Sequence, residues 1–246
     1  MIVFDYSIYF VVTFIVSTVF ASGGVGSAVA LVPIFSMMGL PLNLAKTIGL
    51  FINSASTIAA STINVHKGLV DFHFALPLVV SVVVATPIGA WLSQYVSEEL
   101  VQWVLTAFLI VSSGLLIFSR REAKAAYDRA WVMFVLGAAV GLVSGLVGVG
   151  GGTPILAVLL LLGFDTKKAA YAVSFVIPFS TLGGFFTYLS FVEMNWPLLA
   201  TVAVASILGG FLGQRIMHLH MNAVQVKKLI AIILLILSGK MLWTLL

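Results

Sequence analysis

A run of glycines interrupts the most apolar part of the sequence. The run reads GVGGGTP at residues 148–154, within a stretch from Ala130 to Phe164 that contains no charged residue. Each glycine costs roughly 1 kcal/mol relative to alanine inside a helix, and proline is poorly tolerated in a helix interior. We therefore expect one helix to end here and another to begin. A weaker copy, GVGSA at residues 24–28, precedes it by an offset of 124 residues.

The composition places these breaks inside a membrane. The chain is 61% hydrophobic and 8% charged, with a mean hydropathy of +1.20, far outside the range of soluble domains. The longest polar stretch, Ser119–Arg129, is too short to enclose a core. We predict an all-α polytopic protein of the cytoplasmic (inner) membrane. Because lipid cannot satisfy free N–H and C=O groups, the breaks must be covered by protein or line a polar cavity. Alternatively, the glycines serve only close helix packing.

Each half of the chain contains the same series of apolar segments. Two short pieces flank a glycine break, and three segments follow that approach the roughly 20 apolar residues needed to cross a bilayer. The segments are 8–21, 29–38, 45–65, 72–95 and 100–118 in the first half, and 131–147, 155–162, 169–191, 196–217 and 226–245 in the second. The sequence thus predicts a first repeat (1–118), a cytoplasmic basic linker (119–130) and a second repeat (131–246).

Loop charges predict the orientation of the two repeats. Lys and Arg accumulate on the cytoplasmic side of membrane proteins, and they gather here in the linker and in the segment 218–228. The Glu98-Glu99 turn and the loop with Glu193 carry no Lys or Arg and are expected outside. Each glycine-broken pair must then be a helical hairpin, and the two repeats must have opposite topology, as in many transporters. Lys46 is an exception to the charge rule, because this arrangement places it near the outer face.

A helix that begins at a glycine turn can bind an anion, because its first N–H groups are free and its end carries a partial positive charge. Both breaks precede a short apolar segment, and polar side chains recur at matching places in the two halves. We predict that the substrate contacts Gly24, Gly26, Asn53, Ser56, Thr57, Gly148, Gly150, Gly151, Gly152, Ser174, Ser180 and Thr181. The alternative for each Ser or Thr is a hydrogen bond to its own helix backbone or to a neighbouring helix.

Motifs for other functions are weak or absent. The glycine run lacks the third glycine of a dinucleotide fingerprint and the Lys-Ser/Thr of a Walker loop. The four histidines do not have the spacing of a zinc site, and the chain contains no cysteine, which rules out disulfides and thiol chemistry. Membrane orientation explains the formal net charge of +4, so we expect no nucleic-acid partner. We predict that the protein is not an enzyme and needs no cofactor or metal.

Four short motifs together carry a family resemblance. They are GVGGG at 148–152 followed by Pro154, Gly24-Val25-Gly26 with Pro33, the pair Gly39 and Gly163, and Lys67-Gly68-x-Val70-Asp71. With them the sequence resembles the TauE/SafE family of membrane permeases, also called sulfite exporters, over nearly the whole chain. The sequence departs from the family pattern at Ser27-Ala28, where further glycines are usual, and at Pro154, which stands earlier than the family's proline. The resemblance implies transport of sulfur-containing anions such as sulfite or small organosulfonates, commonly export.

These observations lead to one functional prediction and one alternative. We predict a secondary transporter that exports small sulfur-containing anions across the cytoplasmic membrane. The expected partners are a small anionic substrate (sulfite, a sulfonate or a related oxyanion), the lipid bilayer and, as a further expectation, a second copy of the chain in a homodimer. The alternative is an anion channel or a non-transporting membrane scaffold, in which the glycines serve only helix contacts.

Overall fold

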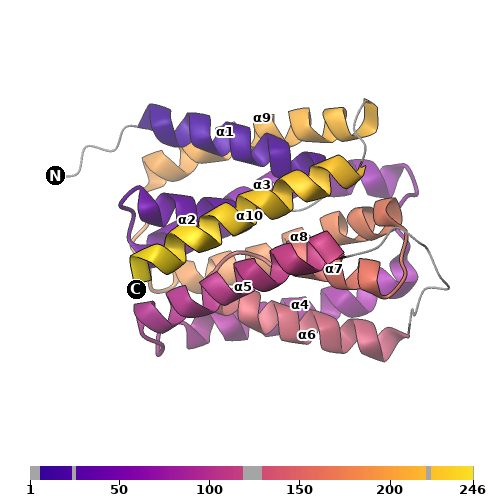
Figure 1. Ribbon diagram of the computed structural model, residues 1–246, viewed down its shortest axis with the longest axis horizontal. Helices are drawn as coiled ribbons and strands as arrows, with labels where there is room; N and C mark the ends of the chain where they lie inside the picture. The colour runs from indigo at the N-terminus through magenta and orange to yellow at the C-terminus, as the bar shows by residue number, and fades with distance from the viewer. Residues whose placement is uncertain (1–5, 24–25, 119–128, 220–222, 246) are drawn as a thin grey trace.

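The regular structure that the computed structural model describes consists of ten α-helices (Figure 1). The description covers residues 6–23, 26–118, 129–219 and 223–245, and no strand is present in these ranges. The helices are α1 (Tyr6–Ser22), α2 (Ala28–Met37), α3 (Leu42–His66), α4 (Phe72–Leu92), α5 (Glu98–Phe118), α6 (Ala130–Val147), α7 (Gly152–Leu161), α8 (Thr166–Leu189), α9 (Trp196–Leu219) and α10 (Ala223–Leu245).

Every apolar segment predicted from the sequence is a helix, with ends that shift by no more than about one turn. Among the described residues, seven helices are long and apolar enough to cross a membrane: α3, α4, α5, α6, α8, α9 and α10. We expected the segment of α6 to be one of the short pieces, but at 18 residues it reaches spanning length. The chain is therefore an all-α, multi-pass membrane protein in which α1, α2 and α7 are the shorter apolar helices.

Contacts between helices recur when each helix is replaced by its counterpart in the other half of the chain. The pair α4 and α6 corresponds to α9 and α1, the pair α4 and α8 to α9 and α3, and the pair α2 and α3 to α7 and α8. In addition, α3 packs on its own counterpart α8, and α5 on its counterpart α10. This contact pattern is what two copies of one five-helix unit would produce around a two-fold axis. The opposite membrane orientation of the two units stays a prediction.

Two glycines at corresponding positions allow the closest helix crossings. A Cβ atom added to Gly89 of α4 would overlap the backbone carbonyl oxygen of Leu142 in α6. A Cβ added to Gly213 of α9 would likewise overlap the carbonyl oxygen of Thr18 in α1. Both members of the second pair stand at the 124-residue offset from those of the first. Small residues at such crossings let the helix backbones approach closely. The resulting van der Waals contacts stabilise the helix pair, because the hydrophobic effect does not drive helices together in lipid.

The motifs of the turns have local structural roles. Gly39 and Gly163 follow α2 and α7 with φ angles of 95° and 91°, and Gly68 follows α3 with a φ of 64°. These left-handed conformations suit glycine at a helix C-terminus, where the chain reverses. The carboxylates of Asp71 and Asp165 then accept hydrogen bonds from first-turn N–H groups of α4 and α8. The family-like segment from Lys67 to Asp71 thus ends one helix and starts the next.

Helix ends from both halves gather at one end of the molecule. The start of α3, the end of α4, the start of α5 and the residues after α8 line one cavity there, through Asn43, Ser93, Glu98 and Phe191. The start of α1 and the end of α10 lie at the same side of the molecule, on the left in Figure 1. The loop charges predict that this end faces the outside.

Cysteine labelling tests that orientation in a chain that has no cysteine of its own. Tyr95, in the turn after α4, is 71% exposed, and Lys67, in the turn after α3, is also exposed. We expect a membrane-impermeant maleimide to label Tyr95→Cys in intact cells, but Lys67→Cys only after permeabilisation. The reverse pattern would invert the orientation, and labelling of both from outside would contradict the model of two inverted repeats.

Candidate functional site

The two glycine breaks meet at the side chain of Asn53. This residue lies in the middle of α3 and is 1% exposed. A Cβ atom added to Gly26, in the first break, would overlap the Asn53 carboxamide. A Cβ added to Gly150, in the second break, would lie 2.7 Å from Asn53 Nδ2. Both breaks therefore need glycine where they contact Asn53, and three residues predicted from separate parts of the sequence come together.

The Asn53 side chain has no hydrogen-bond partner. Its Nδ2 and Oδ1 atoms are both buried and unpaired, as is Oγ1 of Thr153 in the first turn of α7. Leaving such a buried group unpaired costs about 1–3 kcal/mol, and most buried polar groups in proteins are paired. An amide that can both donate and accept is thus free between the two breaks.

The second break turns the chain with two glycines in the left-handed region. Gly148 ends α6 with a φ of 71°, and Gly150 also has a φ of 71°. We expected the next helix to start at Ile155, but α7 starts at Gly152. Pro154 consequently lies in the first turn, where an N–H group would have no acceptor in the helix. The first-turn N–H groups and the positive end of the helix dipole lie at the break.

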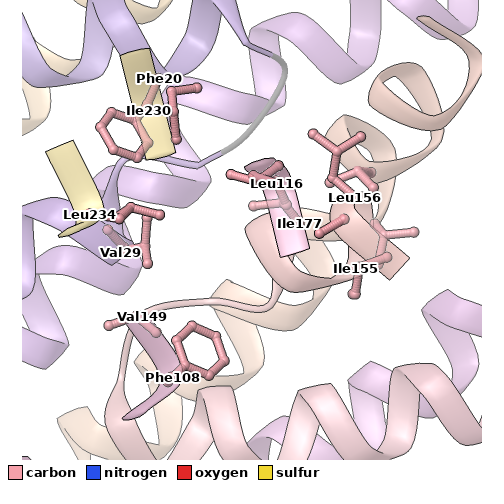
Figure 2. Packing of buried hydrophobic residues seen from close by; sticks show 14 of the residues in the cluster. Phe20, Val29, Phe108, Leu116, Val149, Ile155, Leu156, Ile177, Ile230 and Leu234 are labelled. Atoms are coloured by element: carbon pink, nitrogen blue, oxygen red, sulfur yellow. The ribbon is translucent and has the colours of Figure 1, made fainter. Parts of the chain in front are cut away.

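The two breaks also contact each other and the surrounding helices. A Cβ added to Gly152 would lie 3.5 Å from the backbone nitrogen of Gly26. Val149, between the glycines, is 1% exposed and belongs to the same buried apolar cluster as Phe108 of α5 (Figure 2). Apolar side chains thus pack around the non-helical backbone, which keeps lipid away from its polar groups.

Thr181 of α8 completes the contact around Gly150. Its Cγ2 atom would lie 2.7 Å from a Cβ added to Gly150. Its hydroxyl donates to the Ile177 carbonyl oxygen (2.8 Å) and lies 2.6 Å from Ser54 Oγ of α3. The methyl group therefore faces the break, while the hydroxyl joins α3 to α8.

The other predicted hydroxyls bond to helices. Ser56 and Thr57 donate to the backbone carbonyl of Asn53, at 3.1 and 2.6 Å. Ser174 accepts a hydrogen bond from Asn64 Nδ2 (2.9 Å), and Ser180 Oγ lies 2.9 Å from Thr86 Oγ1. This is the alternative that the sequence analysis left open for Ser and Thr. Ser56 and Thr57 thus bond within α3, while Ser174 joins α8 to α3 and Ser180 joins α8 to α4.

The remaining predicted glycines are distributed around the breaks. Gly24 lies outside the described residues. Gly151 precedes α7, and a Cβ added there would lie 2.7 Å from Val140 Cγ1 in α6. A Cβ added to Gly148 would overlap the aliphatic stem of Lys46. Gly148 therefore connects the second break to a charged residue that was not among the predicted site residues.

Lys46, which the predicted topology placed near the outer face as an exception to the charge rule, is buried. It lies near the start of α3 and is 1% exposed. Its Nζ atom donates to Asn43 Oδ1 (3.2 Å) and to Ser93 Oγ (3.0 Å), and lies 5.5 Å from the centre of the Tyr188 ring. The sequence did contain a sign of this residue's importance, because Lys46 is a lone lysine in a predicted membrane segment. Burying such a charge in a membrane is costly, which makes the residue a candidate for a functional role.

Comparison with known proteins adds two findings. The family model described as "Sulfite exporter TauE/SafE" matches residues 9–241. A protein of Methanocaldococcus jannaschii described as "Probable membrane transporter protein" is 24% identical over 194 residues, which cover 73% of this chain and 71% of the relative. The family match extends over nearly all of the ten helices described above and includes both glycine breaks.

Proposed function

Because the chain belongs to the sulfite exporter TauE/SafE family of membrane transporters, we propose that it exports small sulfur-containing oxyanions, such as sulfite or an organosulfonate, across the cytoplasmic membrane. In this proposal it acts as a secondary transporter and leaves its substrate chemically unchanged. The relative's description supports membrane transport in general. The choice of an anion rests on the chemistry of the glycine breaks.

The unpaired carboxamide of Asn53 is the observation that carries this choice. It lies between Gly26 and Gly150, with the start of α7 at the same break. Its Nδ2 and the first-turn N–H groups are donors, and the helix dipole favours negative charge at that end. An oxyanion that reaches this point accepts hydrogen bonds from Asn53 and from the backbone. A cation would meet the positive end of the helix instead.

We assign different roles to the predicted site residues. Asn53 contacts the substrate directly, while Gly26, Gly150 and Gly152 let the anion approach the backbone. The remaining residues position the breaks: Gly24, Ser56, Thr57, Gly148, Gly151, Ser174, Ser180 and Thr181. Relative movement of the two five-helix units would expose the breaks to each side of the membrane in turn, as in other carriers built from repeats.

Sulfite counterflow in liposomes tests this proposal. Liposomes that contain the purified protein are loaded with unlabelled sulfite and diluted into radiolabelled sulfite. We expect transient accumulation of label that saturates with concentration and elutes as unchanged sulfite, because a carrier exchanges bound substrate. Flux without saturation or accumulation would favour the alternative of a channel, and no flux of sulfite or sulfonates would favour a membrane scaffold. Chemical conversion of the label would contradict the non-enzymatic role.

A further inference from the structure

A cavity of about 350 Å³ lies at the end of the molecule where helix ends from both halves gather. Its polar lining residues are Asn43 and Lys46 of α3, Ser93 and Gln94 after α4, and Glu98 at the start of α5. The cavity is large enough for a small oxyanion together with water. Lys46 and Asn53 are seven positions apart on α3, which corresponds to two turns or roughly 10 Å. The cavity is therefore close to the breaks but separate from Asn53.

Lys46 has only neutral hydrogen-bond partners in this cavity wall. Its ammonium group carries three donors, and two of them are directed to Asn43 Oδ1 and Ser93 Oγ. Buried charges are ordinarily paired with an opposite charge, since desolvation disfavours an isolated ion. The Glu98 carboxylate acts on Lys46 electrostatically across the cavity, but it makes no hydrogen bond with the ammonium group. The Lys46 side chain also lines the cavity directly. Its charge and its remaining donor can therefore be satisfied by an anion in the cavity.

Further contacts connect Lys46 to the second glycine break. The Tyr188 ring lies beside its ammonium group, and the Tyr188 hydroxyl is 2.9 Å from the carbonyl oxygens of both Gly145 and Leu146 at the end of α6. Gly148, which ends α6, packs on the stem of the same lysine. Lys46 is thus held between the cavity and the break by α6 and α8, which fixes the position of its charge.

We propose that this cavity is a second oxyanion-binding site, through which the substrate passes between the breaks and the outer solution. Lys46 supplies the positive charge, and Ser93 Oγ and the Gln94 amide supply further hydrogen bonds. The carboxylate of Glu98 shares the cavity and repels the anion, which keeps its affinity low enough for release. The proposal rests on the proposed function for the class of anion, but it concerns binding and is measured without transport.

Protection of a cysteine in the cavity wall tests this site. Val96 lines the cavity and provides none of the proposed polar contacts. The purified Val96→Cys protein is reacted with a maleimide at increasing methanesulfonate, with gluconate replacing it at constant ionic strength. Methanesulfonate is chosen because, unlike sulfite, it does not consume maleimide. We expect saturable slowing of the reaction, and no slowing in Lys67→Cys, whose thiol lies far from the cavity.

Substitutions in the Val96→Cys background identify the residues responsible. With Lys46→Met, the concentration for half-protection should rise by roughly tenfold or more, the value of one charge-assisted hydrogen bond. Lys46→Arg should keep part of the protection, and Glu98→Gln should lower the half-protecting concentration. Asn53→Leu should leave protection unchanged, because Asn53 does not line the cavity. Loss of flux, which reports on Asn53, is thereby distinguished from loss of protection, which reports on the cavity. Each variant is first shown to be monodisperse by size-exclusion chromatography.

Three results would overturn the proposal. The first is equal protection of the Lys46→Met and parent proteins, and the second is no protection of the parent at any concentration. The third is that phosphatidylglycerol in nanodiscs protects the cysteine and that methanesulfonate does not compete with this lipid. That result would assign the cavity to a lipid headgroup. If Lys46→Met fails to fold, Glu98→Gln remains decisive, because unchanged or weaker protection in that variant contradicts repulsion by Glu98.

Discussion

Asn53→Leu is expected to abolish sulfite counterflow while it raises the thermal stability of the protein. The leucine removes an amide whose two polar atoms have no protein partner, and relief of such a group is worth about 1–3 kcal/mol. The same change removes a hydrogen bond to a charged ligand, worth about 1.5–3 kcal/mol, or a factor of roughly 10 to 150 in affinity. Counterflow in liposomes and the unfolding midpoint of the purified protein measure the two effects.

Asn64→Leu is the matched control on the same helix. Asn64 is buried in α3 and donates a hydrogen bond to Ser174 of α8. Its replacement should raise the unfolding midpoint less than Asn53→Leu does, because it removes a hydrogen bond between helices together with only one unpaired atom, Oδ1. Normal counterflow in Asn64→Leu, with counterflow lost in Asn53→Leu, would separate an asparagine that contacts the substrate from one that holds helices together. Wild-type counterflow in Asn53→Leu would remove the central support for the proposed substrate site.

Gly150→Leu is expected to eliminate counterflow altogether. Gly150 has a φ of 71°, and its missing Cβ leaves room for Asn53 Nδ2 and Thr181 Cγ2, each 2.7 Å from the position that a Cβ would occupy. A side chain there costs about 1–2 kcal/mol in backbone strain and fills the space between the breaks. Counterflow is measured at equal amounts of protein that is monodisperse after reconstitution.

Gly114→Leu provides the control for a larger side chain on a membrane helix. Gly114 lies in α5, and an added Cβ would meet no atom within 4 Å. We expect normal counterflow, because the new side chain enters open space and displaces no neighbouring atom. If Gly150→Leu also transported normally, the glycine run would serve only helix packing, as the alternative interpretation of the sequence holds.

The sequence determined the helices and the position of the breaks, because both depend on local properties. A run of about 20 apolar residues must form a helix in lipid to satisfy its backbone, and GVGGGTP at 148–154 cannot continue one. The 124-residue offset also brought Gly26 and Gly150 into the same prediction. The structure places both against Asn53, and their contact with a substrate remains our proposal.

Only the tertiary structure decided which face of each helix is buried in the protein and which is exposed. In α4, Val82 is fully buried whereas Val80 and Val84 are 55% and 59% exposed, although the three side chains are identical. Lipid and the protein interior are both apolar, so a membrane helix lacks the polar face that would reveal its orientation in a soluble protein. Sequence patterns therefore could not show that Ser174 and Ser180 face Asn64 and Thr86.

For the charged residue Lys46, too, the sequence did not show what the side chain contacts. The topology that the loop charges predict placed it near the outer face, as an exception to the charge rule. The structure buries it between Tyr188 and Gly148, which are more than 100 positions away in the sequence. Local sequence determines that a helix forms around Lys46, but only the packing of α3 against α8 and the second break determines what its charge faces.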